Sequence, residues 1–215
     1  MGEELSHVRP YPAAAATSLA ARKLNEFRAG WPVLLGALIG VGIGNAALPY
    51  YTYGVFLKEL EASFGWSRAQ ISAGQMIGLA CIALVAPLVG AAIDRFGVRR
   101  PLACSLVFLA CGFLVLGTSM DSLGEFYAIQ AGLALLCTAS SPIAFTRAVN
   151  GWFVQARGLA LGLMLMGTGV TATFAPAFTT WVIERSGWRS AYLALAALVI
   201  ATYMEIGRAS CRERV

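Results

Sequence analysis

Two apolar segments without a single charge, residues 69–93 and 101–119, restrict the fold of this chain more than any other feature. A helix needs about 20 mostly apolar residues to cross the hydrocarbon of a bilayer, so each segment is long enough to cross. Charged side chains are costly in lipid, so the stretch between the segments is predicted to be a tight turn at one face of a membrane. That stretch holds four charges: Asp94, Arg95, Arg99 and Arg100.

The overall composition is that of a membrane protein. Of the 215 residues, 58% are hydrophobic and 13% are charged, against about 45–50% apolar and about 25% charged in ordinary globular chains. The net charge of +5 could indicate nucleic-acid binding, but the basic residues stand at the edges of apolar segments and form no patch interleaved with aromatics. We therefore predict an all-α membrane protein with the lipid bilayer as a partner and no nucleic-acid partner.

Apolar length predicts six transmembrane helices between residues 31 and 204, preceded by a cytoplasmic N-terminal tail over residues 1–30. The tail carries no signal peptide, and a short interfacial helix is expected over Leu19–Phe27. Aromatic residues suited to the membrane interface stand near several ends of the predicted spans. The six spans are residues 31–57, 69–93, 101–119, about 126–148, about 158–182 and about 190–204.

The distribution of basic residues predicts the orientation of this bundle. With the N-terminus inside, the cytoplasmic segments hold nine bases and the opposite segments hold four. Lys and Arg are enriched in cytoplasmic loops, so we place the N-terminus in the cytoplasm. The nine are Arg9, Arg22, Lys23, Arg28, Arg95, Arg99, Arg100, Arg147 and Arg157, and the four are Lys58, Arg68, Arg185 and Arg189.

Side chains for catalysis or metal binding are scarce in this sequence. The single histidine, His7, lies in the N-terminal tail, and four of the five cysteines lie inside apolar segments, where they suit packing. The sequence offers no pair of acids, histidine cluster or nucleophile arrangement. We predict no enzymatic activity, no metal and no cofactor.

The charged turn also has a characteristic spacing. Gly90, Asp94, Arg95, Gly97, Arg99 and Arg100 match the pattern G-x-x-x-D-[RK]-x-G-x-[RK]-[RK] one for one. The run resembles the loop signature of the major facilitator superfamily, between its second and third helices. The resemblance implies two six-helix bundles, of which this chain supplies the N-terminal one. It also implies that the six residues form a latch between the bundles on the cytoplasmic side. The alternative is that the arginines only anchor the loop at that face.

A second signature follows the predicted fourth span. Phe153, Arg157, Leu159, Ala160, Gly162 and Gly167 match the pattern of monocarboxylate porters and their bacterial oxalate/formate-type relatives, which this stretch resembles. Gln155 and Ala156 replace two bases of that pattern, and the acid-Gly-aromatic signature of the subgroup's first span is missing. The resemblance implies transport of small organic anions, monocarboxylates first among them.

Polar residues inside the apolar spans are the candidate substrate contacts, because polar groups are costly in lipid and tend to face the interior. In the family that the chain resembles, the first, second, fourth and fifth helices line the cavity. Hydrogen bonding between helices is the alternative role for each candidate, and for Arg147, near the predicted cytoplasmic end, a role in topology is preferred. The candidates are Asn45, Tyr50, Tyr53, Gln75, Gln130 and Arg147.

Small residues and prolines predict how the spans pack. Glycines at helical spacing allow membrane helices to approach closely, and Pro142 and Pro176 are expected to kink the fourth and fifth spans. The glycine rows are Gly36, Gly40 and Gly44 in the first span, Gly74 and Gly78 in the second, and Gly158 and Gly162 in the fifth.

Together these features predict a secondary active transporter that works by alternating access, present here as its N-terminal half. Residues 205–215 interrupt the sixth span abruptly and resemble translated adapter sequence, so we expect a non-native tail and a missing C-terminal six-helix half. A basic stop-transfer end is the alternative. The alternative functions are a non-transporting receptor or scaffold on the same fold, and a facilitator for a different small solute. The expected location is the bacterial inner membrane.

Overall fold

The computed structural model describes residues 13–212, and within them it places the side chains of residues 22–204. Every regular element in this part of the chain is helical, so the predicted all-α fold is confirmed for it. The predictions on residues 1–12, including His7 and Arg9, and on the side chains of residues 205–215 lie outside the described residues. The elements are α1 (Ala13–Ile43), α2 (Leu48–Phe64), α3 (Arg68–Phe96), α4 (Arg99–Thr118), α5 (Leu123–Cys137), the short 3-10 helix η1 (Thr138–Ser140), α6 (Pro142–Trp152) and α7 (Arg157–Arg212).

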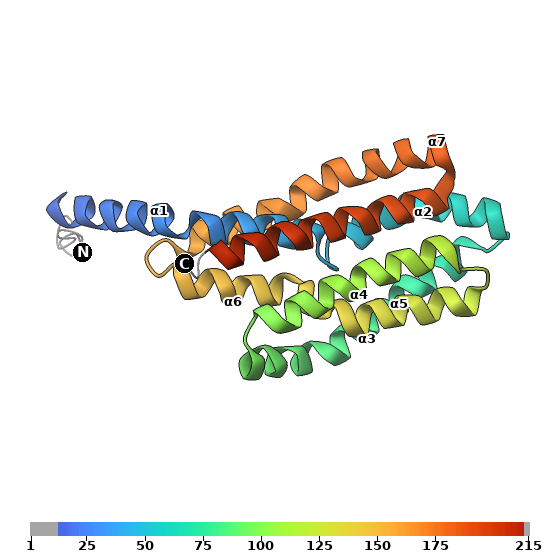
Figure 1. Cartoon of the computed structure of the whole chain (residues 1–215), viewed down its shortest axis with the longest axis horizontal. Coiled ribbons are helices and arrows are strands. Elements are labelled where there is room, and N and C mark those ends of the chain that lie inside the picture. The colour runs from blue at the N-terminus through green and yellow to red at the C-terminus, as the bar shows by residue number, and fades with distance from the viewer. Residues whose placement is uncertain (1–12, 213–215) are drawn as a thin grey trace, which may run out of the picture.

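The helices form an elongated bundle, with α1, α2 and α7 on one side and α3 to α6 on the other (Figure 1). Helices long and apolar enough to cross a membrane are present, as predicted. The described residues contain five such stretches: Arg22–Phe64, Arg68–Phe96, Arg99–Thr118, Leu123–Trp152 and Arg157–Met204.

The last of these stretches is a helix that folds back on itself. It is 48 residues long, about 72 Å at 1.5 Å per residue, which is more than twice the thickness of the hydrocarbon. Gly187 interrupts it with φ 81° and ψ 167°, a backbone conformation that glycine adopts without steric cost. Figure 1 shows the chain reversing there, so that α7 has two arms, residues 157–186 and 188–212, that run in opposite directions.

Two of the spanning stretches are broken helices. The first is interrupted by a turn at residues 44–47 between α1 and α2, and Pro49 lies in the first turn of α2. The second is interrupted by η1, after which Pro142 begins α6. Proline lacks an N–H and suits the first turn of a helix. The kink expected at Pro142 is therefore a full break. The span predicted over residues 31–57 lies within the first stretch, where a turn divides it, since α1 stops at Ile43 and α2 starts at Leu48.

The N-terminal part of α1 extends beyond the rest of the bundle (Figure 1). The sequence suggested a separate short helix ending at Phe27, but α1 runs without a break through Pro32. The Glu26 carboxylate holds this extension to the loop before α7, where it accepts the backbone N–H groups of Gln155 and Ala156 at 3.1 Å. These N–H groups lie in the loop just before α7, at the end of a helix where backbone N–H groups have no partner within the helix.

Two clusters of buried apolar side chains hold the helices together. The larger one joins α2, α4, α5 and both arms of α7 around Phe56, whose ring stacks on that of Tyr192 with centroids 3.8 Å apart. The smaller one joins α1, α6 and the first arm of α7 around Phe145, Phe153 and Met164. Because lipid is as apolar as these side chains, close packing rather than water exclusion stabilises such contacts.

The predicted glycine rows make close contacts at some positions only. A Cβ at Gly44 would clash with the Ser140 carbonyl oxygen, and one at Gly74 would lie 2.6 Å from the Phe126 ring. At Gly36, by contrast, a Cβ would meet nothing within 4 Å, and the same holds at Gly158 and Gly162. The closest approach of α1 to α7 lies elsewhere, where a Cβ at Gly167 would clash with the Leu38 carbonyl oxygen.

Candidate functional site

A hollow between α2, α3 and α5 gathers five of the six predicted substrate contacts. We call it the amide hollow, and its volume is about 60 Å³. A cavity needs about 10–15 Å³ to hold one water, so this hollow has room for a few waters. Its lining consists of Asn45, Pro49, Tyr50, Tyr53, Gln75, Gly78, Leu79, Ile82, Gln130, Leu133 and Ala134.

Local structure explains why these side chains meet. Asn45 lies in the turn that breaks the first spanning stretch, and the two tyrosines follow it on the first turns of α2. Gln75 shares one face of α3 with Gly78, since residues three apart are neighbours on a helix. A Cβ at Gly78 would lie 3.8 Å from the Gln130 carbonyl oxygen, so this small residue lets α3 lie against α5.

Tyrosine hydroxyls tie the wall of the hollow to the backbone of α3. The Tyr53 hydroxyl donates to the Ile71 carbonyl, and the Tyr127 hydroxyl donates to the Gln70 carbonyl at 2.8 Å. Tyr53 lies in α2 and Tyr127 in α5, so both neighbours of α3 are fixed to it near its first turn. This arrangement orients the Tyr53 ring at the hollow.

The chemistry of the hollow is polar and uncharged. Its three amide side chains can both donate and accept hydrogen bonds, and its tyrosine hydroxyls can do the same. None of the lining residues is charged. A solute here would be recognised through hydrogen bonds, and an anion would need its counter-charge from a group outside this lining.

Arg147, the sixth candidate, lies away from the hollow. It is on α6, where its guanidinium forms an ion pair with the Asp94 carboxylate near the end of α3. A Cβ at Gly90, one turn before Asp94, would lie 4.0 Å from the Arg147 Nη2 atom. The structure therefore joins Arg147 to the predicted latch.

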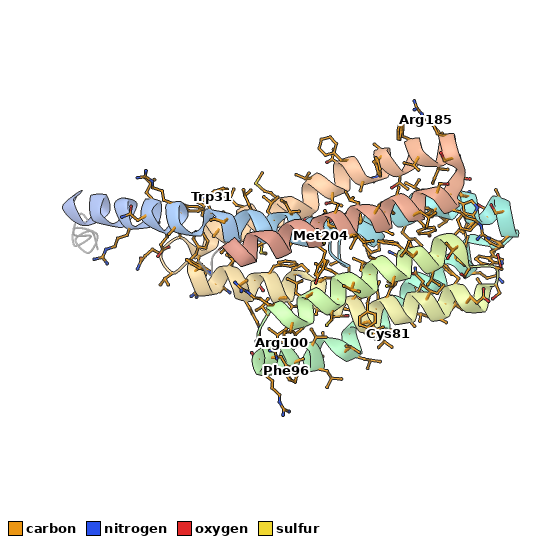
Figure 2. The ribbon with its side chains drawn as sticks, in the orientation of Figure 1. Trp31, Cys81, Phe96, Arg100, Arg185 and Met204 are labelled. Carbon is orange, nitrogen blue, oxygen red and sulfur yellow. The ribbon has the colours of Figure 1, made fainter. Side chains whose placement is uncertain are left out.

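The charged turn is a tight connection between α3 and α4. Gly97 adopts φ 76° and ψ 169°, which a residue with a Cβ rarely adopts. Figure 2 shows Phe96 and Arg100 near one end of the bundle, while Arg185 lies at the other. Asp94 pairs with Arg147, 53 residues later in the chain. Nothing in the sequence near Asp94 indicates this partner.

The second signature covers the loop between α6 and α7 and the first turns of α7, and it is buried at some positions only. Phe153 is fully buried, and its carbonyl accepts from the Arg157 Nε at 3.4 Å. Gly167 makes the backbone contact with α1 described above, whereas Gly162 faces open space. Within the described residues, this signature shows packing contacts at three of its positions, Phe153, Ala160 and Gly167.

At the opposite end of the bundle, Arg189 binds the end of α4. Its guanidinium donates to the carbonyls of Thr118 and Met120, both at 3.2 Å, and to the Asp121 carboxylate at 2.8 Å. It also lies over the Trp188 ring, 4.7 Å from the centroid. The sequence suggested only a topological charge here, because nothing near Arg189 in the chain points to α4.

Comparison with known proteins decides the family. The family described as Major Facilitator Superfamily matches residues 34–206. The chain belongs to this superfamily. It is therefore a multi-pass integral membrane protein of a transporter family, as the charged turn predicted, and not an enzyme.

Individual relatives place this superfamily member near the monocarboxylate transporters. It is 31% identical over 173 residues to monocarboxylate transporter 13 of Rattus norvegicus, covering 79% of the chain. It is 27% identical over 175 residues to monocarboxylate transporter 1 of Mus musculus, covering 80%. A riboflavin transporter of Trypanosoma cruzi is 28% identical over 187 residues, covering 82%. The chain spans 39%, 34% and 38% of the length of these three relatives.

Proposed function

We propose that this chain is the N-terminal six-helix bundle of a secondary active transporter that moves small organic anions, monocarboxylates first among them, by alternating access. The observation that carries the proposal is the amide hollow, where side chains from three spanning stretches converge inside an apolar bundle. The names of the relatives and the residues of the second signature support the substrate class.

Six crossings are part of this proposal. Four of the five apolar stretches can each cross once. The fifth is about 72 Å long if straight and reverses at Gly187, so each of its arms supplies one crossing. The predicted fifth and sixth spans, about 158–182 and about 190–204, fall on these two arms.

A second six-helix bundle is also part of the proposal. The chain spans 34–39% of the length of three transporters that it resembles, and the uncharged lining of the amide hollow leaves the counter-charge of an anion to be supplied from elsewhere. The second bundle would provide it, and would meet the latch residues Gly90, Asp94, Arg95, Gly97, Arg99 and Arg100. That residues 205–215 are not native stays a prediction, which the genomic sequence around this reading frame tests.

We further propose that the N-terminus and the charged turn face the cytoplasm. The turn carries three arginines within six residues, the feature that most favours the cytoplasmic side. A bacterial inner membrane stays a prediction, since the relatives named above come from mammals and a trypanosome.

One observation favours a second candidate function. The hollow is lined by amides and tyrosines with no charge, which suits a neutral polar solute as well as an anion. A facilitator for a neutral small solute is therefore the runner-up. A receptor or scaffold without transport is the remaining alternative, and it predicts binding without flux.

The test is uptake of radiolabelled lactate into proteoliposomes that contain the product of the complete reading frame. We expect saturable uptake that pyruvate inhibits and a neutral sugar does not. Replacement of an amide in the hollow, Gln75→Leu, should raise KM about fivefold or more, the effect of one lost hydrogen bond.

Gln155→Leu is the matched control, because Gln155 lies outside the hollow and contacts Glu26 through its backbone N–H. Its KM should stay within about twofold of the wild type. Uptake of a neutral solute but not of lactate would favour the runner-up, and solute binding without any uptake would favour the receptor.

A further inference from the structure

The two helix breaks of the bundle meet at one point. The first lies between α1 and α2 at residues 44–47, and the second is η1 between α5 and α6. A Cβ at Gly44 would clash with the carbonyl oxygen of Ser140 in η1. Glycine therefore lets the backbone of one break lie directly against the backbone of the other, although the two are almost 100 residues apart in the chain.

Two serines satisfy the backbone groups that these breaks leave without helical partners. The Ser140 hydroxyl accepts the backbone N–H of Asn45 at 3.2 Å and donates to the Cys137 carbonyl at 2.8 Å. The Ser105 hydroxyl donates to the same carbonyl at 2.8 Å and accepts the backbone N–H of Ser140 at 2.9 Å. We call these two hydroxyls and the three backbone groups the serine hub.

The serines of the hub are buried, and Asn45 is half-buried. Ser105 is 1% exposed, and Ser140 and Cys137 are fully buried. Buried backbone groups without a partner are strongly unfavourable, so both breaks depend on these hydroxyls. Ser105 comes from α4, so the hub joins three of the spanning stretches.

The hub also adjoins the amide hollow. Asn45 lines the hollow while its backbone N–H is held by the hub. On the α5 side, Cys137 lies one turn after Leu133 and Ala134, which line the same hollow. The hub therefore sets where Asn45 stands relative to the α5 wall.

We propose that Ser105 and Ser140 are positioning residues of the amide hollow: without contacting a solute, they hold Asn45 against the α5 wall. The part of this proposal that concerns a substrate rests on the proposed function. The part that concerns the geometry of the hollow does not, and the test of it needs no substrate.

The test measures how fast single cysteines in the hollow react with a charged methanethiosulfonate reagent. In the full chain in lipid vesicles, Cys81, Cys104, Cys111 and Cys211 are replaced by Ala, and the fully buried Cys137 is kept. The two reporters are Asn45→Cys, held by the hub, and Gln75→Cys, which lies on α3 across the hollow.

Ser105→Ala should raise the reaction rate at the Asn45→Cys reporter about fivefold, as expected for one lost hydrogen bond, and leave the Gln75→Cys reporter within about twofold. Ser140→Ala should act in the same way, and because it leaves the Ser105 bond to Cys137 in place, it serves if Ser105→Ala does not fold. Thr202→Val is the matched control, since this nearly buried hydroxyl bonds the Leu198 carbonyl of its own helix and lies outside the hub.

Unchanged rates at the Asn45→Cys reporter in both folded serine variants would overturn the proposal. Equal increases at both reporters would show general loosening of the bundle and would overturn the proposal too, as would failure of both serine variants to fold.

In lactate uptake by the complete gene product, the serine variants should raise KM about fivefold with the maximal rate unchanged. If wild-type uptake is absent, the proposed function fails while the reporter result stands.

Discussion

At the scale of single residues, what lies across an interface decides the importance of a glycine. Gly36 and Gly44 belong to the same predicted row, and sequence spacing treats them alike. The structure separates them, because a Cβ at Gly44 would clash with a backbone carbonyl whereas one at Gly36 would meet nothing within 4 Å. A backbone atom cannot rotate out of the way as a side chain can.

Gly44→Ala should therefore destabilise the bundle strongly, by about 2–4 kcal/mol, since the two helix breaks must move apart. Gly36→Ala should be neutral or slightly stabilising, because alanine is the better helix former by about 1 kcal/mol. Thermal unfolding in detergent, followed by tryptophan fluorescence, measures both. Equal melting temperatures for the two variants would contradict the close approach.

The Asp94–Arg147 ion pair is the second feature at this scale. The Arg147 side chain is 41% exposed and that of Asp94 is 64% exposed, so the pair contributes at most about 1 kcal/mol to stability. The ion pair would then act on the change between conformations rather than on stability, as expected of a latch that breaks when the bundles move.

Arg147→Gln and Asp94→Asn remove the same ion pair from its two sides. A latch role predicts that both variants change the maximal rate of lactate uptake alike and leave KM within about twofold. A substrate role for Arg147 predicts a KM raised about tenfold or more by Arg147→Gln alone. The concentration dependence of uptake into proteoliposomes separates the two roles.

At the scale of helices, the residues at helix ends and breaks determine where each helix starts and stops. Two helix starts are readable from the sequence, because a serine followed three residues later by Gln or Glu forms a capping box. Ser67 with Gln70 begins α3 in this way, and Ser122 with Glu125 begins α5. The end of α4 is different, since its free carbonyls are bound by Arg189 from α7.

Arg189→Met should lower the melting temperature by a few degrees, which corresponds to about 1–2 kcal/mol, because two carbonyls and the Asp121 carboxylate lose their donor. Arg185→Met is the matched control: this neighbouring arginine lies over the Trp181 ring, and its loss should cost less than about 1 kcal/mol. An equal effect of both variants would show that Arg189 is only a surface charge.

At the scale of the whole molecule, the fold-back at Gly187 decides how many times the chain crosses. With six crossings, the loop between α6 and α7 lies on the same side as the charged turn, and the Gly187 turn lies on the opposite side. A straight helix over Arg157–Met204 would instead project out of the membrane by about 40 Å.

Single cysteines introduced into the background described above test this topology. Ser119→Cys and Ser186→Cys should react with a membrane-impermeant maleimide added outside intact cells, whereas Gln155→Cys should react only after the cells are opened, since the positive turns stay inside. Protection of Ser186→Cys in intact cells together with reaction of Ser119→Cys would contradict the fold-back.

Local length, charge and spacing along the chain are enough to predict several features of this protein. These are the helical membrane fold, the family through the charged turn, and the amides and tyrosines that the structure gathers in one hollow. Each follows from residues close together in the chain, because apolar length and the cost of a polar group in lipid act on one segment at a time.

Which distant residues meet depends on how the helices pack. Asp94 pairs with Arg147, Arg189 binds the end of α4, and Ser140 receives the N–H of Asn45. In each case a charged group, or a backbone group at a helix end or break, has no partner nearby in the chain. It binds a partner on another helix instead. No pattern along the chain specifies that partner, since it depends on how close the helices come, and small residues such as Gly44 set that distance.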